Sequence, residues 1–424
     1  MSETRDNRLN WLLSSSAMSN LGDGMGKVAF PLLAATLTRE PILIAGLAAT
    51  QFLPWLLFAL LAGALVDRVD RRKAMLVANG TRAVAIGLMA ALVYADLVSI
   101  WVIYAAALLV GTAETVADSA ANVIVPSVVE RGRLESANSK LQSAEIVGQT
   151  FLGGPIGSVT FALFAAFPFL LNSAAFGLAA VLLLGMAGTY EPKGRSDGRP
   201  IAPRNLRADL ADGIHWLRGS PLLTRLVIIA GLLALTSEFA QAQLVLYALE
   251  DLDLNEAAFG LFAFVGGIGG LLGAAVAPRL IQMFSRRSML AVGIVAAGLG
   301  FGGMGLTANA IVAALLFGLF AAAIVTVNVI LATLRHMLVP NELLGRVLGV
   351  WRTVVWGAVP VGALIGGVLT EVFGTPSETF LFSGGCQIAL AVAAFFALRH
   401  FNAEVDSAGS KTDSADHLTR ALDR

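Results

Sequence analysis

Long apolar runs alternate with short charged connections along almost the whole chain. A helix needs about 20 predominantly apolar residues to cross the hydrocarbon core of a membrane, and about twelve runs approach or exceed that length. We therefore predict an all-α polytopic membrane protein. The predicted spans cover approximately residues 11–37, 42–66, 74–94, 98–125, 141–167, 169–189, 222–249, 257–284, 289–306, 310–334, 347–370 and 379–398. The break between the ninth and tenth spans depends on Thr307-Ala308-Asn309 alone.

The connection between the second and third spans is short and strongly basic. It contains Arg68, Arg71, Arg72 and Lys73 within eleven residues that begin at Gly63. Cytoplasmic loops carry an excess of Lys and Arg, and the other connections predicted on this side are also basic, whereas those on the opposite side are mostly acidic. This asymmetry predicts that both termini lie in the cytoplasm.

Composition agrees with a membrane protein that has little mass outside the bilayer. The chain is 57% hydrophobic and 14% charged, whereas soluble domains average about 25% charged residues. The zero net charge gives no indication of a nucleic-acid partner, and the single Cys386 excludes a disulfide within the chain. There is no Gly-x-x-x-x-Gly-Lys-Ser/Thr loop for a nucleotide and no His or Cys set spaced for a metal. We expect no cofactor and no enzyme activity, with a proton gradient as the energy source.

The spans divide into two groups of six. We predict an N-terminal half over residues 1–190, a cytoplasmic loop over 191–220, a C-terminal half over 221–400 and a disordered cytoplasmic tail over 401–424. An amphipathic helix at the membrane surface is predicted inside the loop. Its apolar residues are Leu206, Leu210, Ile214 and Leu217.

Weak internal symmetry relates the two halves. Gly63 and Gly273 end the second and eighth spans, and Asp23 and Glu238 lie midway along the first and seventh. The segment after Gly273, Ala277-Pro278-Arg279, lacks the acid of the first basic loop. Repeats of this kind are typical of transporters, whose substrate site lies between them.

Two motifs resemble those of the major facilitator superfamily. Gly63-x-x-x-Asp67-Arg68-x-x-Arg71-Arg72-Lys73 resembles its signature loop, Gly-x-x-x-Asp-Arg/Lys-x-Gly-Arg-Arg-Arg/Lys, although Asp70 stands where Gly is usual. Gly153-Gly154-Pro155-Ile156-Gly157-Ser158 is similar to the Gly-Pro-x-x-Gly-Gly element of the drug/proton antiporters, with Ser158 in place of one Gly. Leu21-Gly22-Asp23-Gly24 and the segment 211–218 resemble the branch of macrolide-efflux, multidrug-efflux and enterobactin-exporter proteins. The resemblance implies export from the cytoplasm, usually driven by inward proton flow.

Ionisable residues inside spans are candidates for function because they are costly there. Asp23 either exchanges protons with a central cavity or only neutralises Lys27, which lies four residues further on the same helix face. Glu114 is the stronger candidate for proton exchange because its own helix carries no basic residue. The alternative is that Glu114 is protonated and hydrogen-bonded and only packs between helices.

Arg82, Asp118 and Glu145 lie on three consecutive spans, within about two turns of the predicted inner surface. They form either an inner-gate charge cluster or a static one, in which Arg82 extends to the surface.

Three polar residues of the second half complete the set of proton or substrate candidates. Glu238 binds a proton or a cationic substrate, or it has only a structural role and is hydrogen-bonded between packed helices. Gln241 and Asn328 are ordinary interhelical hydrogen-bonding residues unless they contact substrate.

The basic loop is also a candidate inner gate, made of Gly63, Asp67, Arg68, Arg71 and Arg72 together with Arg82. The family pattern implies that Asp67 meets the start of the eleventh span and locks the outward-facing state. The alternative is that the loop only determines topology.

The fifth span contains a glycine-proline segment, Gly154, Pro155 and Gly157. This segment is either a hinge that also packs tightly against a neighbouring helix, or only a kink required by packing.

We therefore predict a secondary active transporter that exports small amphiphilic or drug-like molecules, hydrophobic or cationic, by alternating access and proton antiport. It would act as a monomer in a bacterial-type plasma (inner) membrane. One alternative is a dedicated exporter of a single metabolite such as a siderophore. An alternative of another class is a non-transporting membrane scaffold or sensor.

Overall fold

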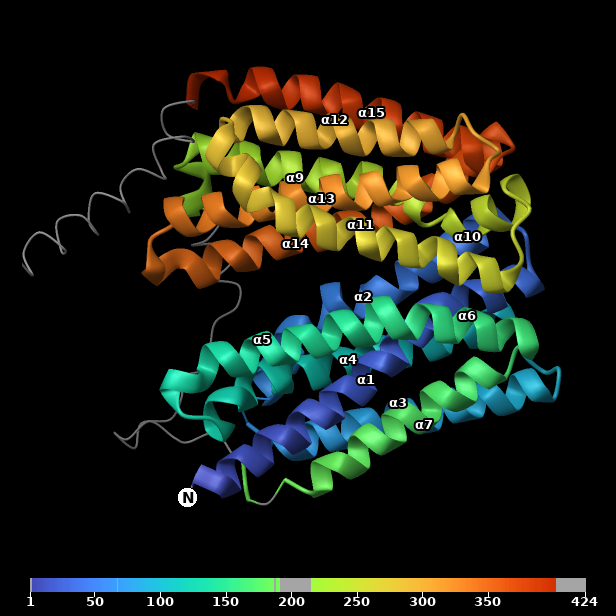
Figure 1. Ribbon diagram of the computed structural model, residues 1–424, viewed down its shortest axis with the longest axis vertical. Helices are drawn as coiled ribbons and strands as arrows, with labels where there is room; N and C mark the ends of the chain where they lie inside the picture. Colours follow the sequence, from blue (N-terminus) through green and yellow to red (C-terminus); the bar gives the residue numbers. More distant parts are fainter. Residues whose placement is uncertain (1, 67, 187, 191–214, 402–424) are drawn as a thin grey trace, which may run out of the picture. The chain divides into compact units, whose positions relative to one another are not determined.

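The computed structural model describes residues 2–66, 68–186, 188–190 and 215–401, and all the regular elements in these ranges are helices (Figure 1). Within these ranges, eleven helical segments are long and apolar enough to cross a membrane. The first helix, α1 (Ser2–Leu37), is not among them because its polar residues lower its hydropathy. These segments match eleven of the twelve predicted spans, and the remaining predicted span, residues 11–37, lies within α1.

The chain forms two compact units. The first unit comprises Met1–Pro203 with Ala242–Phe264, and the second comprises Arg204–Gln241 with Val265–Arg424. The elements that the structure describes in the first unit are α1, α2 (Pro41–Val66), α3 (Arg71–Tyr94), α4 (Ile100–Val128), η1 (Arg131–Arg133), α5 (Leu134–Glu145), the π-helix η2 (Ile146–Gly153), α6 (Gly154–Leu163), α7 (Phe167–Leu184), α10 (Leu244–Leu246), η3 (Tyr247–Asp251) and the start of α11 (Glu256–Met283).

The second unit is built around α9 and α12. Its described elements are α9 (Pro221–Gln241), the remainder of α11, α12 (Arg286–Met304), α13 (Ala310–Leu338), α14 (Asn341–Phe373), α15 (Pro376–Ala397) and η4 (Arg399–Phe401). Helix α9 packs on α14 and α15, while α12 packs on α13 and α15. Leu226, Ile294 and Leu334 are fully buried in the shared apolar core. Gly269 and Gly273 lie against the backbone of α13, so that α11 approaches it closely.

Helix α1 is the central element of the first unit. It packs against α7, η2, α6, α5 and α4. Glycines allow this close approach, because a Cβ atom on Gly22 would lie 2.7 Å from Asn172 Oδ1 and one on Gly24 would lie 2.7 Å from Gln149 Cα. The polar side chains of α1 are therefore placed among neighbouring helices.

Capping side chains determine several helix boundaries. Helix α12 ends at Met304, and the Asn309 side chain accepts hydrogen bonds from the N–H groups of Ile311 and Val312 at the start of α13, which confirms the predicted break. Helix α3 begins at Arg71, three residues before the predicted start, because Asp70 caps it. The predicted amphipathic segment, apart from the buried Leu217, and the predicted tail from residue 402 lie outside the described residues.

Candidate functional site

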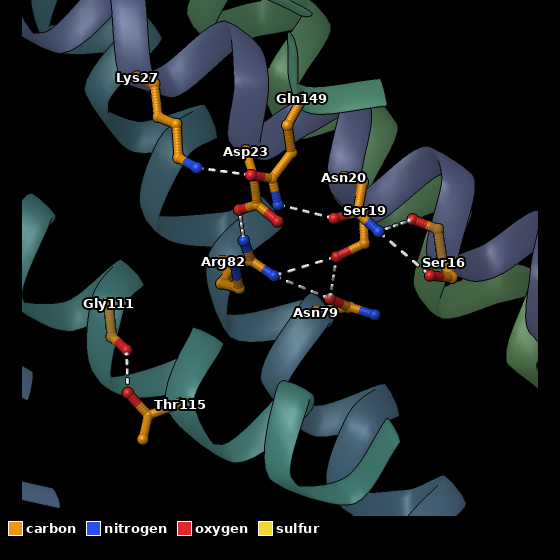
Figure 2. A network of polar contacts seen from close by, with 10 residues as sticks. All are labelled: Ser16, Ser19, Asn20, Asp23, Lys27, Asn79, Arg82, Gly111, Thr115 and Gln149. Atoms are coloured by element: carbon orange, nitrogen blue, oxygen red, sulfur yellow. Dashed lines mark hydrogen bonds and ion pairs between the residues drawn. The ribbon is translucent and has the colours of Figure 1, made fainter. Parts of the chain in front are cut away.

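One face of α1 carries a stripe of polar side chains (Figure 2). Ser16, Asn20, Asp23 and Lys27 follow each other at spacings of three or four residues, and Ser19 directly precedes Asn20, so the five lie on adjoining turns of one side of the helix. Two chains of hydrogen bonds start from this stripe. One reaches α3 and the other reaches the π-helix η2.

The first chain is centred on an ion pair between Asp23 and Arg82, which is fully buried on α3. The guanidinium also donates to Ser19 Oγ at 3.1 Å and to Asn79 Oδ1 at 3.4 Å. It lies 3.8 Å from the centre of the Phe176 ring. A buried guanidinium is costly unless it is paired and hydrogen-bonded, and these contacts supply both kinds of compensation.

This pairing excludes two of the alternatives that the sequence left open. Asp23 is not neutralised by Lys27, because each side chain finds its partner on a different neighbouring helix. Arg82 does not extend to the surface but is fully buried, and its role in an inner gate stays a prediction. It lies eleven residues into α3, about 16 Å from the helix start, where an internal carboxylate is closer than either surface.

The second chain holds Lys27. Its Nζ donates to Gln149 Oε1, Gln149 Nε2 donates to Asn20 Oδ1 at 2.7 Å, and Asn20 Nδ2 donates to Ser16 O at 2.8 Å (Figure 2). Sequence reasoning did not find Gln149. The available signal was an amide inside an apolar span, four residues after Glu145, but its partner depends on the π-helix, a feature often found at functional sites.

The acids of α4 complete the charged group of the first unit. Glu114 and Asp118 interact electrostatically with Arg82, and Asp118 also interacts with Glu145 and Lys27. Both acids of α4 are half-buried. Among the described residues, neither forms an ion pair within 4.0 Å. The structure thus gathers Asp23, Lys27, Arg82, Glu114, Asp118 and Glu145 within electrostatic range in one unit.

The basic loop contacts the end of α7. The Asp70 carboxylate accepts hydrogen bonds from Lys73 N at 3.1 Å and Tyr190 N at 2.9 Å. Burial raises the pKa of Asp70, but the hydrogen bonds from the backbone N–H groups of Tyr190, Lys73 and Arg72 outweigh it and hold this pKa below its usual value. With φ at −63°, Asp70 needs no glycine-like conformation.

Arg72 binds the same end of α7, donating to Leu183 O at 2.7 Å and Leu184 O at 2.9 Å. Cations are favourable at a helix C-terminus. In the second unit, Arg287 follows the cap residue Ser285 and donates to Phe395 O of α15 at 2.8 Å. The structural counterpart of the basic loop is therefore Ser285-Arg286-Arg287. The segment Ala277-Pro278-Arg279 continues α11 instead.

The remaining gate candidates are only partly described. Asp67 lies outside the described residues, so its lock with the eleventh span stays a prediction. Gly63 has open space where a Cβ atom would be, and Arg68 is exposed. Arg71 N donates to Tyr190 O at 3.3 Å.

The glycines of the fifth crossing form part of the seam with α1. A Cβ atom on Gly153 would lie 2.6 Å from Gly24 Cα, and one on Gly157 would lie 2.9 Å from Met25 O, whereas one on Gly154 would make only an ordinary contact. Pro155 lies in the first turn of α6, where the π-helix ends. Buried Ser158 accepts from Gly260 N at 3.1 Å and donates to Glu256 O at 2.8 Å, so its hydroxyl bridges the first turn of α11.

In the second unit, the three candidate residues form no hydrogen bond or ion pair with one another. Glu238 is half-buried on α9, near the close approach of Gly362 on α14. Gln241 Oε1 is buried and accepts no hydrogen bond from any residue that the structure describes. Asn328 is exposed on α13.

Comparisons with known proteins agree with this architecture. The model of a family described as transmembrane secretion effector matches residues 2–423. The chain is 25% identical over 411 residues to the multidrug efflux pump Tap of Mycolicibacterium fortuitum, covering 93% of this chain and 97% of the relative. It is 26% identical over 392 residues to the MFS-type transporter YfiS of Bacillus subtilis, covering 90% and 91%. A mutant of the nucleoside transporter NupG shares the fold, with a TM-score of 0.77 at 12% identity over 93% of this chain and 100% of that chain.

Proposed function

We propose that this chain, which belongs to the transmembrane secretion effector family of major facilitator transporters, exports small amphiphilic molecules in exchange for protons. It is a multi-pass protein of the bacterial plasma membrane and a transporter, in a family that is not a class of enzymes. The relative named as a multidrug efflux pump supports outward transport of drug-like molecules.

The observation that carries the proposal is the position of Arg82 between two sets of carboxylates. Its guanidinium pairs with Asp23 on α1 and interacts electrostatically with Glu114 and Asp118 on α4. A proton on Asp23 removes the charge that compensates Arg82, and the attraction of the guanidinium to the acids of α4 is then no longer opposed by Asp23. Proton binding at one carboxylate therefore changes the charge available at the others.

Glu114, with Asp23 or Asp118, exchanges the proton in this account. The acids of α4 lie within a long crossing, fourteen residues from the start of α4 for Glu114, so about 21 Å from that end of the helix. Ionisable side chains at that depth mark ion or proton pathways in transporters. No cofactor is required, because the proton gradient supplies the energy.

Cargo and protons compete for the same acids. The cargo is hydrophobic or cationic, because Glu114, Asp118 and Glu145 attract positive charge while Arg82 is compensated by Asp23. The transporter acts as a monomer with both termini in the cytoplasm, by alternating access, and Asp67 contributes to the inner gate.

Counter-transport in proteoliposomes tests the proposal. Purified protein is reconstituted with an imposed pH gradient and offered a panel of fluorescent amphiphilic dyes. We expect dye movement against its own gradient, which collapses when an ionophore removes the pH gradient. Dye movement that is insensitive to the ionophore would contradict proton coupling, and the absence of any dye movement would favour a dedicated exporter or a non-transporting role.

A further inference from the structure

Lys27 carries a positive charge for which the described part of the chain supplies no ion-pair partner. Asp23, its neighbour on the same helix face, is paired with Arg82. Asp118 is near enough to interact electrostatically but forms no ion pair with Lys27 within 4.0 Å. The ammonium group is held instead by a neutral amide oxygen, Gln149 Oε1.

The hydrogen bonds behind Gln149 orient it toward Lys27. Gln149 Nε2 is committed to Asn20 Oδ1, and Asn20 is itself bonded to Ser16 (Figure 2). The amide oxygen of Gln149 therefore faces the ammonium, and the lysine side chain is held in one position. An ammonium has three donors, and Gln149 takes one of them, which leaves two for another acceptor.

Lys27 is exposed although it lies deep in the membrane-crossing part of α1. It lies ten residues before the end of α1, about 15 Å along the helix. A charge that faces hydrocarbon is costly, so an exposed ammonium at this depth requires water or a polar ligand. Asp118 on α4 is within electrostatic range of Lys27, and Glu114 is within electrostatic range of Asp118.

We propose that Lys27 is the anion-binding group of the transport site, and that the exported molecules include zwitterions. The oxyanion of such a molecule accepts hydrogen bonds from Lys27, while its cationic group is attracted by Glu114 and Asp118. This inference rests on the proposed transport function and extends its substrate class from hydrophobic and cationic molecules to zwitterions. A role for Lys27 as a mere counter-ion would place it in contact with Asp23 or Asp118, whereas its contact is to Gln149.

A matched pair of dyes tests the inference. Rhodamine B is a zwitterion with a free carboxylate, and its ethyl ester has the same fluorophore and cation without the anion. Binding of each dye to the purified full-length protein in detergent is measured by fluorescence polarisation. We expect Lys27→Gln to raise the Kd for rhodamine B about tenfold, which corresponds to the loss of one charge-assisted hydrogen bond. The Kd for the ester should not rise, because losing a positive charge does not weaken attraction of a cation.

Two further variants control the measurement. Lys27→Arg keeps the charge and should keep the preference for rhodamine B over its ester. Lys140→Gln removes an exposed lysine of α5 that lies outside the site and should leave both Kd values unchanged. Equal weakening of both dyes by Lys27→Gln, or no change in either, would overturn the inference while leaving cation export intact. Failure of the unmodified protein to bind or transport either dye would count against the proposed function itself.

Discussion

Asp23 and Arg82 are 59 residues apart in sequence and form a buried ion pair between α1 and α3. The pair joins the central helix of the first unit to the helix that follows the basic loop. Because the guanidinium also donates to Ser19 and Asn79, its position is fixed from both helices. The pair is thus both a packing contact and the group through which the acids of α4 interact with α1.

Replacing Asp23 by Asn leaves the buried guanidinium without its counter-charge. Breaking one partner of a buried ion pair costs about 3–5 kcal/mol. We expect a clear fall in the thermal unfolding midpoint, followed by tryptophan fluorescence in detergent. The double variant Asp23→Asn with Arg82→Gln should recover part of the loss, because neither charge remains. Glu371→Gln, at an exposed position, is the control. Equal midpoints for Asp23→Asn and the unmodified protein would show that the pair contributes no stability.

Asp70→Ala should destabilise the first unit and change its pH dependence. The variant loses the cap of α3, worth about 1 kcal/mol, and the bond to Tyr190 N. Because the folded-state pKa of Asp70 is lowered, its contribution is present at neutral pH and is lost as the pH falls through that pKa. The gap between the two unfolding midpoints should stay constant from about pH 7 to about pH 5 and narrow below about pH 4. A gap that does not change at acid pH would contradict this role.

The close seam of the fifth crossing predicts different effects at two adjacent glycines. A Cβ atom at Gly153 would lie 2.6 Å from Gly24 Cα and must displace backbone, whereas one at Gly154 would lie 3.7 Å from Val28 Cγ2. Overpacking typically costs about 1–3 kcal/mol. We expect Gly153→Ala to lower the unfolding midpoint and Gly154→Ala to leave it nearly unchanged. Equal effects at the two positions would argue against the seam.

The contact between Ser158 and α11 predicts that one substitution can compensate for another. A methyl group at Gly260 would collide with the Ser158 side chain, whose hydroxyl accepts from Gly260 N. Gly260→Ala should therefore destabilise the first unit, and adding Ser158→Gly should restore much of the midpoint by removing the obstructing atoms. A double variant that is no more stable than Gly260→Ala alone would place the strain elsewhere.

Most of the helical architecture could be predicted because helices that cross a bilayer need long apolar runs. The loops between them could be recognised in the sequence from charged residues or from helix-capping residues. The break at Thr307-Ala308-Asn309 was visible because Asn309 is a good cap residue. The π-helix Ile146–Gly153 was not visible, because a change in hydrogen-bond register has no clear compositional signal. The inclusion of Ala242–Phe264 in the first unit depends on tertiary contacts that sequence spacing does not contain.

The candidate site was also predictable only in part. The ionisable residues could be identified because charges inside spans are rare, but their partners could not. Spacing along α1 allowed a pair between Asp23 and Lys27, whereas packing brought Arg82 and Gln149 to them from two other helices. The importance of Gln149 follows only from its contact with Lys27, because a single glutamine in a span is usually an ordinary interhelical contact.

The most direct test of the account is whether cargo movement drives proton movement through Glu114. Proteoliposomes that contain an internal pH probe receive a dye gradient with no imposed pH gradient. The account predicts that dye flux through the unmodified protein changes the internal pH, and that Glu114→Gln abolishes this change although the protein still inserts and folds. Dye flux without any pH change in the unmodified protein, or an equal pH change with Glu114→Gln, would contradict it.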